Sequence, residues 1–204
     1  VGKTSSSYTS ELRITSGTFN IYYSSSYALY IYARNSSDLG RVHVSGGTLN
    51  VGNGSSHPLA DCDVQDNGEL KVSGTGTVNI SDELEVGGSS NEVATVTISG
   101  GTLNICTSGG SGGSDDPKLD FDAYSTLAGT GGTIYIKGRH STSPTNPAVE
   151  FSDPDNGNAT PPGQTINASG TAFVFQDAIS GMTYYYVDFN GKTTGSVTIN
   201  RNDS

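Results

Sequence analysis

Val96-Thr-Ile-Ser-Gly-Gly-Thr-Leu-Asn-Ile105 is the stretch that decides the fold of this chain. Apolar and polar residues alternate on both sides of a Ser-Gly-Gly corner, which is the period-two pattern of β-strands. Val96 and Ile98 are therefore expected to face the same side as Leu103 and Ile105. Gly100 and Gly101 are expected to supply the positive φ angles that a sharp bend needs. The stretch predicts two short strands joined by a tight corner.

The same phrase returns along the chain at 14–21, 42–51 and 72–80, with weaker copies at 131–136, 166–174 and 194–199. Its threonine recurs at steps of 30, 29, 25, 31 and 38 residues, at Thr18, Thr48, Thr77, Thr102, Thr133 and Thr171. A corner repeated in this way, with only strand and turn residues between, is typical of a solenoid. We therefore predict an all-β parallel β-helix (β-solenoid) of about six irregular coils. The alternative is an antiparallel sandwich, in which turns come every ~8–12 residues without a repeated phrase.

The repeats divide the chain into three parts. Residues 1–11 are predicted to form an N-terminal arm, 12–137 the regular coils, and 138–204 irregular C-terminal coils and end strands, with a hairpin signal at Asn190-Gly191. No amphipathic helix is predicted that would cap the ends of the array. Because an uncapped end leaves backbone groups unpaired, we expect contacts from end to end between copies, which build filaments when they do not close.

Composition narrows the classes of function. Twenty acidic residues stand against ten basic ones, giving a formal net charge of −10. This sign argues against nucleic acid and against anionic membrane surfaces as partners. No apolar run approaches membrane-spanning length. The abundance of hydroxyl residues, the scarcity of lysine and the start at Val1 lead us to expect a processed protein that is extracellular or on the cell surface.

The two cysteines are expected to be buried thiols. Cys62 and Cys106 lie two repeats apart and at different offsets from their repeat threonines. Stacked strands are about 4.8 Å apart, so two coils already exceed the Cα separation of an ordinary disulfide.

Outward-facing columns are the candidate binding or interface residues. Within Thr-Leu-Asn-Ile the core takes Leu and Ile, so stacking is expected to align polar side chains on the outside: Thr18, Thr48, Thr77 and Thr102, with Asn20, Asn50, Asn79 and Asn104. Tyr30 and Tyr32 are expected to face outward because Leu29 and Ile31 face the core. Such surfaces suit polysaccharide, ice or lateral packing, and polar ladders also stabilise flat sheets without any ligand.

Evidence for a metal site or for catalysis is limited to short patterns. Asp153 and Asp155 resemble the opening of a calcium loop, although Gln164 stands where the twelfth-position carboxylate belongs. Calcium is accordingly the one candidate cofactor. His43, His57 and His140 are scattered and lack a nucleophile motif, and the carboxylate pairs Asp61/Asp63 and Asp120/Asp122 are typical of solvated strands. We therefore expect no enzymatic activity.

The phrase Ser-Gly-Gly-Thr-Leu-Asn-Ile at 99–105, with 45–51 and Tyr27-Ala28-Leu29-Tyr30, resembles repeats of secreted bacterial right-handed β-helix proteins, some of which are carbohydrate-binding or adhesin-like. The resemblance covers residues 12–136 well. It implies a right-handed parallel β-helix, polysaccharide binding, and calcium bound at the corners. No acidic cluster is seen to recur from coil to coil. The sequence predicts an extracellular, non-enzymatic, structural or adhesive β-solenoid that self-assembles end to end, or alternatively a polysaccharide-binding module assisted by calcium.

Overall fold

The computed structural model describes residues 7–23, 28–52, 60–88, 92–107, 119–137, 149–151, 163–176, 187–188 and 197–201, and these form strands and no helix. A ten-stranded sheet holds β1 (Thr9–Ile14), β2 (Thr18–Ile21), β4 (Leu39–Val44), β5 (Thr48–Val51), β7 (Gly68–Val72), β8 (Thr77–Ile80), β10 (Ala94–Ile105), β12 (Ser125–Lys137), β14 (Thr165–Gln176) and β16 (Val197–Arg201). A six-stranded sheet holds β3 (Leu29–Ile31), β6 (Cys62–Gln65), β9 (Leu84–Gly87), β11 (Leu119–Phe121), β13 (Val149–Glu150) and β15 (Val187–Asp188).

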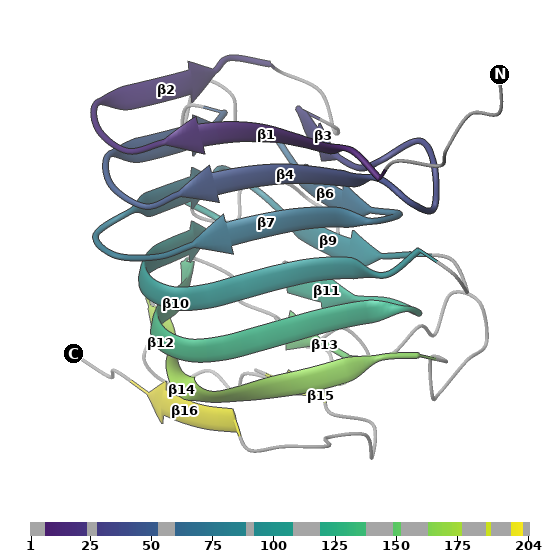
Figure 1. Cartoon of the computed structure of the whole chain (residues 1–204). Coiled ribbons are helices and arrows are strands. Elements are labelled where there is room, and N and C mark those ends of the chain that lie inside the picture. The colour runs from purple at the N-terminus through teal and green to yellow at the C-terminus, as the bar shows by residue number, and fades with distance from the viewer. Residues whose placement is uncertain are drawn as a thin grey trace, which may run out of the picture.

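Every ladder between these strands is parallel, which excludes the antiparallel sandwich. Each strand pairs with its counterpart in the next copy of the repeated phrase. Thr18 lies opposite Thr48, Thr48 opposite Thr77, and Thr77 opposite Thr102. Figure 1 shows the result as a stack in which β1, β4, β7, β10, β12 and β14 lie one above another, with the six-stranded sheet behind them.

Five corners use one left-handed glycine each, namely Gly17, Gly47, Gly74, Gly101 and Gly132, whereas the corner in β14 has none. β10 runs through the whole Val96–Ile105 stretch, pairing with β7 before the corner and with β8 after it. Gly101 has a φ of 71°, but Gly100 does not adopt a positive φ, so the prediction that both glycines do so is wrong. Gly100 is needed for space, because a Cβ there would lie 2.9 Å from the backbone nitrogen of Gly74 in the neighbouring corner.

The core lies between the two sheets. Val96, Ile98, Leu103 and Ile105 are all fully buried, as their alternation predicted. The six-stranded sheet supplies the opposite wall from the same alternation; Leu84, Val86, Leu119 and Phe121 are among its buried residues. The Phe121 ring also stacks on Phe151, with ring centroids 5.3 Å apart. Such apolar burial is the main source of stability in a fold of this kind.

Both cysteines are buried free thiols, in agreement with the sequence-based prediction. Cys62 takes a core position in β6, and Cys106 follows β10 directly. Burial raises the pKa of the Cys62 thiol, and the neighbouring carboxylates of Asp63 and Asp61 raise it further. The thiolate, which is the reactive form of cysteine, is therefore suppressed at Cys62.

The structure differs from the predicted organisation at both ends. β1 begins at Thr9, inside the stretch expected to be an arm, because Thr9–Ile14 pairs in register with Leu39–Val44. At the other end Ala172, not Thr171, lies opposite Thr133. Thr171 is buried instead, and its hydroxyl donates a hydrogen bond of 2.9 Å to the Gly131 carbonyl. β13–β16 continue both sheets beyond residue 138, and the hairpin expected at Asn190-Gly191 lies outside the described residues.

Candidate functional site

The four predicted asparagines form a continuous side-chain ladder, which we call the asparagine ladder. Asn50 Nδ2 donates to Asn20 Oδ1, Asn79 Nδ2 to Asn50 Oδ1, and Asn104 Nδ2 to Asn79 Oδ1, each at 2.7 Å. An amide carries both a donor and an acceptor, so identical residues in register satisfy one another. The ladder stops after Asn104, because the register places Tyr135 at the next position.

The threonine column runs beside the asparagine ladder. Thr18 is exposed, whereas Thr48, Thr77 and Thr102 are half-buried. The ladder shows the same gradient, from an exposed Asn20 to a buried Asn104. The amides that were predicted to offer a binding face are largely used within the fold, and their accessible part lies towards β2.

The N-terminal end of the stack exposes residues that occupy core positions elsewhere. Leu12 lies opposite Val42, and Phe19 lies opposite the fully buried Leu49, yet Leu12 is 37% and Phe19 45% exposed. Among the described strands, β1, β2 and β3 each pair on one side only, and they form the upper edge in Figure 1. Three tyrosines, Tyr8, Tyr22 and Tyr23, are exposed beside them. An apolar end with unpaired strand edges is an association surface.

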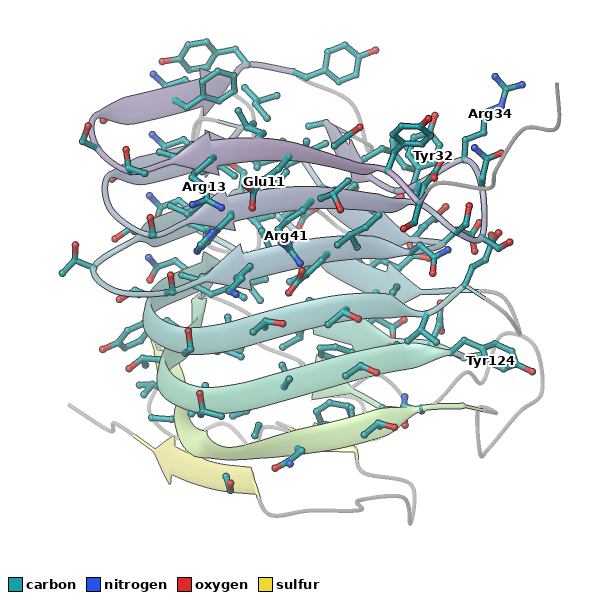
Figure 2. All side chains as sticks on the ribbon, in the orientation of Figure 1. Glu11, Arg13, Tyr32, Arg34, Arg41 and Tyr124 are labelled. Atoms are coloured by element: carbon teal, nitrogen blue, oxygen red, sulfur yellow. The ribbon has the colours of Figure 1, made fainter. Side chains whose placement is uncertain are left out.

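Tyr30 and Tyr32 face outward as predicted. Their exposed fractions are 46% and 57%, while Ile31 between them is buried. Tyr30 lies in β3 opposite Asp63 of β6, and Tyr32 follows β3. Figure 2 shows Tyr32 on the side of the stack away from the corners and distant from Glu11, Arg13 and Arg41. β3, which carries Tyr30, belongs to the six-stranded sheet, whereas the strands of the asparagine ladder belong to the ten-stranded sheet.

A charged network covers the outer face of β1, β4 and β7. Glu11 accepts a 2.7 Å hydrogen bond from Arg13 and lies 3.6 Å from Arg41, which also pairs with Glu69 (Figure 2). The hydrogen bond from Arg13 is the main cause that holds the pKa of Glu11 below its ordinary value. Glu69 Oε1 accepts a further bond of 2.9 Å from the Thr97 hydroxyl. Opposite charges thus alternate from strand to strand.

The same face brings together a serine, a histidine and a carboxylate that the sequence did not connect. His43 Nε2 lies 2.9 Å from Ser73 Oγ, and His43 Nδ1 lies 3.7 Å from Glu11 Oε1. Burial lowers the pKa of His43, and the nearby Lys71 lowers it further, so the ring stays neutral near pH 7. This order of groups is that of a hydrolytic triad. The 3.7 Å separation is too long for the hydrogen bond that would orient the imidazole as a base.

A column of acidic residues follows the six-stranded sheet, and sequence reasoning missed it. Register places one carboxylic acid on each of five successive strands: Asp63, Glu85, Asp120, Glu150 and Asp188. We call these five residues the acid column. The sequence analysis looked for an acidic cluster that recurs from copy to copy, whereas the recurring feature is a single carboxylic acid on each strand. The signal was a second repeated phrase, Cys-Asp-Val, Leu-Glu-Val, Leu-Asp-Phe, Val-Glu-Phe and Val-Asp-Phe, at 62–64, 84–86, 119–121, 149–151 and 187–189.

Among the three members of the acid column whose side chains the structure describes, Asp63 is the most buried. It is 1% exposed, and neither carboxylate oxygen has a hydrogen-bond partner of normal geometry. Burial raises its pKa to about 7, and the carboxylates of Glu85 and Asp61 add to the shift, while the Tyr30 hydroxyl opposes it. Burial also raises the pKa of Glu85. Because a carboxylate only accepts hydrogen bonds, adjacent members cannot satisfy each other as the asparagines do.

The candidate calcium ligands Asp153 and Asp155 lie outside the described residues. Within the part of the chain that the structure describes, no group of three or more His, Cys, Asp and Glu side chains is placed to hold a metal ion. The same described residues include no helix that is long and apolar enough to cross a membrane. Comparison with known proteins adds no relative, since no family model, no curated protein and no solved structure matches this chain.

Proposed function

We propose that this chain is a right-handed parallel β-solenoid that acts as an extracellular, non-enzymatic structural or adhesive protein and assembles end to end into filaments or a surface layer. The solenoid assignment is supported by the parallel ladders, which join each copy of the repeated phrase to the next at spacings of about 25–40 residues. A secreted role is supported by the hydroxyl-rich composition with few lysines.

The observation that carries self-assembly is the exposure of Leu12 and Phe19 at an unpaired strand edge. Both occupy core columns, so a further parallel strand laid on β1 and β2 would bury them as Val42 and Leu49 are buried. Burying exposed apolar surface is favourable by about 25 cal/mol per Å². The same strand would pair the free backbone edge. Association at this end thus satisfies two requirements at once.

The test is to look for filaments of the purified protein in plain buffer by negative-stain electron microscopy and sedimentation velocity. We expect uniform filaments from the wild type and dispersed particles from Phe19→Asp, which places a charge in the end surface. Ser99→Asp is the matched control, because Ser99 is exposed at a corner away from the end, and filaments should persist. A wild-type protein that remains monomeric at all concentrations would overturn the proposal.

The non-enzymatic part of the proposal concerns Ser73, His43 and Glu11. The long His43–Glu11 separation argues against an activated serine, since a general base must be held by its orienting partner. We expect Ser73 to be inert to a fluorophosphonate probe and ester hydrolysis to be unchanged in Ser73→Ala. Labelling of Ser73 that is lost in His43→Ala would establish a hydrolase instead.

Polysaccharide binding, assisted by calcium, is the second candidate, favoured by the exposed rings of Tyr30 and Tyr32. Aromatic faces with a polar tip suit stacking on sugars. A binding module would be retained on insoluble cellulose or pectin, and Tyr32→Ala would release it, while Tyr22→Ala would serve as the control at the end surface. Repeating the assay with chelator would separate a calcium requirement from direct contact.

A further inference from the structure

We propose that two copies join with β16 of one molecule added in parallel to β2 of the next, in the register that aligns Thr198 with Thr18, Ile199 with Phe19 and Asn200 with Asn20. This inference rests on the proposed end-to-end assembly and names the surfaces and the register that the joint uses. The partner of the exposed N-terminal end is accordingly a second copy of this chain.

The two ends of the ten-stranded sheet carry the same pattern in the same columns. β2 presents Thr18, Phe19 and Asn20 at one end of the strand order. β16 lies at the other end, where Thr198 is opposite Ala172, Ile199 opposite Phe173 and Asn200 opposite Val174. Following the ladders from strand to strand leads from Thr18 to Thr198 and from Asn20 to Asn200. A copy stacked on the N-terminal end would therefore continue each column with a matching residue type.

The asparagine ladder also has a direction. Each amide donates towards the N-terminal end, from Asn104 through Asn79 and Asn50 to Asn20. Asn20 thus uses only its oxygen within the described residues, and its Nδ2 donor remains at the exposed end. In the proposed register Asn200 of a second copy would occupy the next position of the column, and an asparagine carries the acceptor that this donor requires. The two N-terminal ends would instead bring donor against donor, so the polarity of the ladder favours the head-to-tail joint.

Apolar contacts favour the same joint. Phe19 is the exposed member of a column whose next members, Leu49, Val78 and Leu103, are all buried. In the proposed register Ile199 of the second copy would be its neighbour. Parallel pairing keeps like positions opposite each other, so a slip by one residue would place Phe19 against a polar neighbour. The register is therefore specified as well as the partner.

A cysteine pair tests the register directly. Adjacent parallel strands lie about 4.8 Å apart, within the Cα separation of a disulfide, so Thr18→Cys with Thr198→Cys should cross-link between molecules. An intramolecular bond is excluded, since six ladders separate β2 from β16, a distance of about 29 Å. The native thiols of Cys62 and Cys106 are buried, and the wild type serves as their control.

We expect mild oxidation of Thr18→Cys/Thr198→Cys filaments to give a ladder of covalent oligomers on non-reducing gels, at least ten times stronger than from Thr18→Cys/Asn200→Cys. The second pair is the matched control, because two residues of offset move its Cα atoms to about 8 Å. Filaments of the first variant that do not cross-link, or that cross-link no better than the control, would overturn the register but leave the proposed function standing. Absence of filaments from the wild type would overturn both.

Discussion

The asparagine ladder and the acid column are built in the same way and reach opposite results. Each places one polar residue per copy at an outward position of successive parallel strands. In the asparagine ladder every step is a 2.7 Å hydrogen bond. In the acid column burial and like charge raise the pKa of Asp63 to about 7. Identical polar side chains in a parallel register satisfy one another only when each of them both donates and accepts a hydrogen bond.

The largest effect is expected from converting one step of the acid column into an amide. Asp63→Asn removes a buried carboxylate and supplies a donor towards Glu85. One pKa unit corresponds to about 1.4 kcal/mol, so we expect the free energy of unfolding at pH 8 to rise by about 2–4 kcal/mol. Urea denaturation measures it. Asp61→Asn is the comparison, because it leaves the Asp63 carboxylate buried, removes only the weaker of its two like-charged neighbours and keeps the bond from the Glu83 backbone N–H. It should raise stability by less than about 0.5 kcal/mol.

The pH dependence of stability should reveal the same carboxyl group in the wild type. Between the ordinary pKa of 3.8 and about 7, the unfolded Asp63 has released its proton while the folded one retains it, so stability falls as pH rises through this window. The pKa of His43 is lowered from 6.5 in the folded protein, so its contribution to stability increases as pH rises towards 6.5. The difference between wild type and Asp63→Asn isolates the Asp63 contribution. A difference that is constant from pH 4 to pH 8 would contradict the assignment.

A carboxylate placed inside the asparagine ladder should reproduce the defect of the acid column. Asp in place of Asn79 still accepts from Asn104 but cannot donate to Asn50, so Asn79→Asp is expected to lower the free energy of unfolding by about 1–3 kcal/mol. Asn20→Asp is the matched control, since Asn20 only accepts from Asn50. Its monomer stability should change by less than about 0.5 kcal/mol. Equal losses in both variants would mean that the direction of the ladder is wrong.

The smallest change in the free energy of unfolding is expected in the charged network, where Glu69 already has hydrogen-bond and ion-pair partners. Glu69→Gln keeps an acceptor for Thr97 but loses the charge that pairs with Arg41. We expect a loss of about 0.5–1 kcal/mol that shrinks as salt is raised to 1 M, because the Arg41 side chain is partly exposed and salt screens its attraction to Glu69. Thermal unfolding at low and high salt measures it. A gain in stability would instead mean that the Glu69 carboxylate destabilises the fold, as we expect for the Asp63 carboxylate.

The asparagine ladder was predictable because its residues stand at a fixed position in the repeated phrase. Asn20, Asn50 and Asn79 each follow their repeat threonine by two residues, so aligning the phrase also aligns the amides. The acid column was missed, because its members lie at variable distances from that threonine and only their own short flanking phrase repeats. Asp63 follows Thr48 by 15 residues, whereas Glu85 follows Thr77 by 8. The segments between the strands differ in length, so the acids do not align in the sequence until the pairing of the strands is known.

The neighbours of His43 show a second limit of sequence reasoning. Glu11, His43 and Ser73 are each about 30 residues apart, and only the pairing of β1 with β4 and of β4 with β7 brings them together. The exposure of Leu12 and Phe19 could not be predicted either, because they alternate with polar residues as core residues do. Nothing in their local sequence marks them as the end of a stack. Burial at such positions depends on whether a neighbouring strand is present.

The sequence by itself determined the strands, the corners and the inward faces, as in Val96–Ile105, because period-two alternation and the left-handed freedom of Gly101 act over a few residues. Only the tertiary structure decided which outward side chains outside the repeated phrase become neighbours, as in the acid column and around His43. That outcome depends on register between strands about 30 residues apart and on the low dielectric that burial creates around Asp63. Local patterns carry neither kind of information, since both arise when distant strands pair.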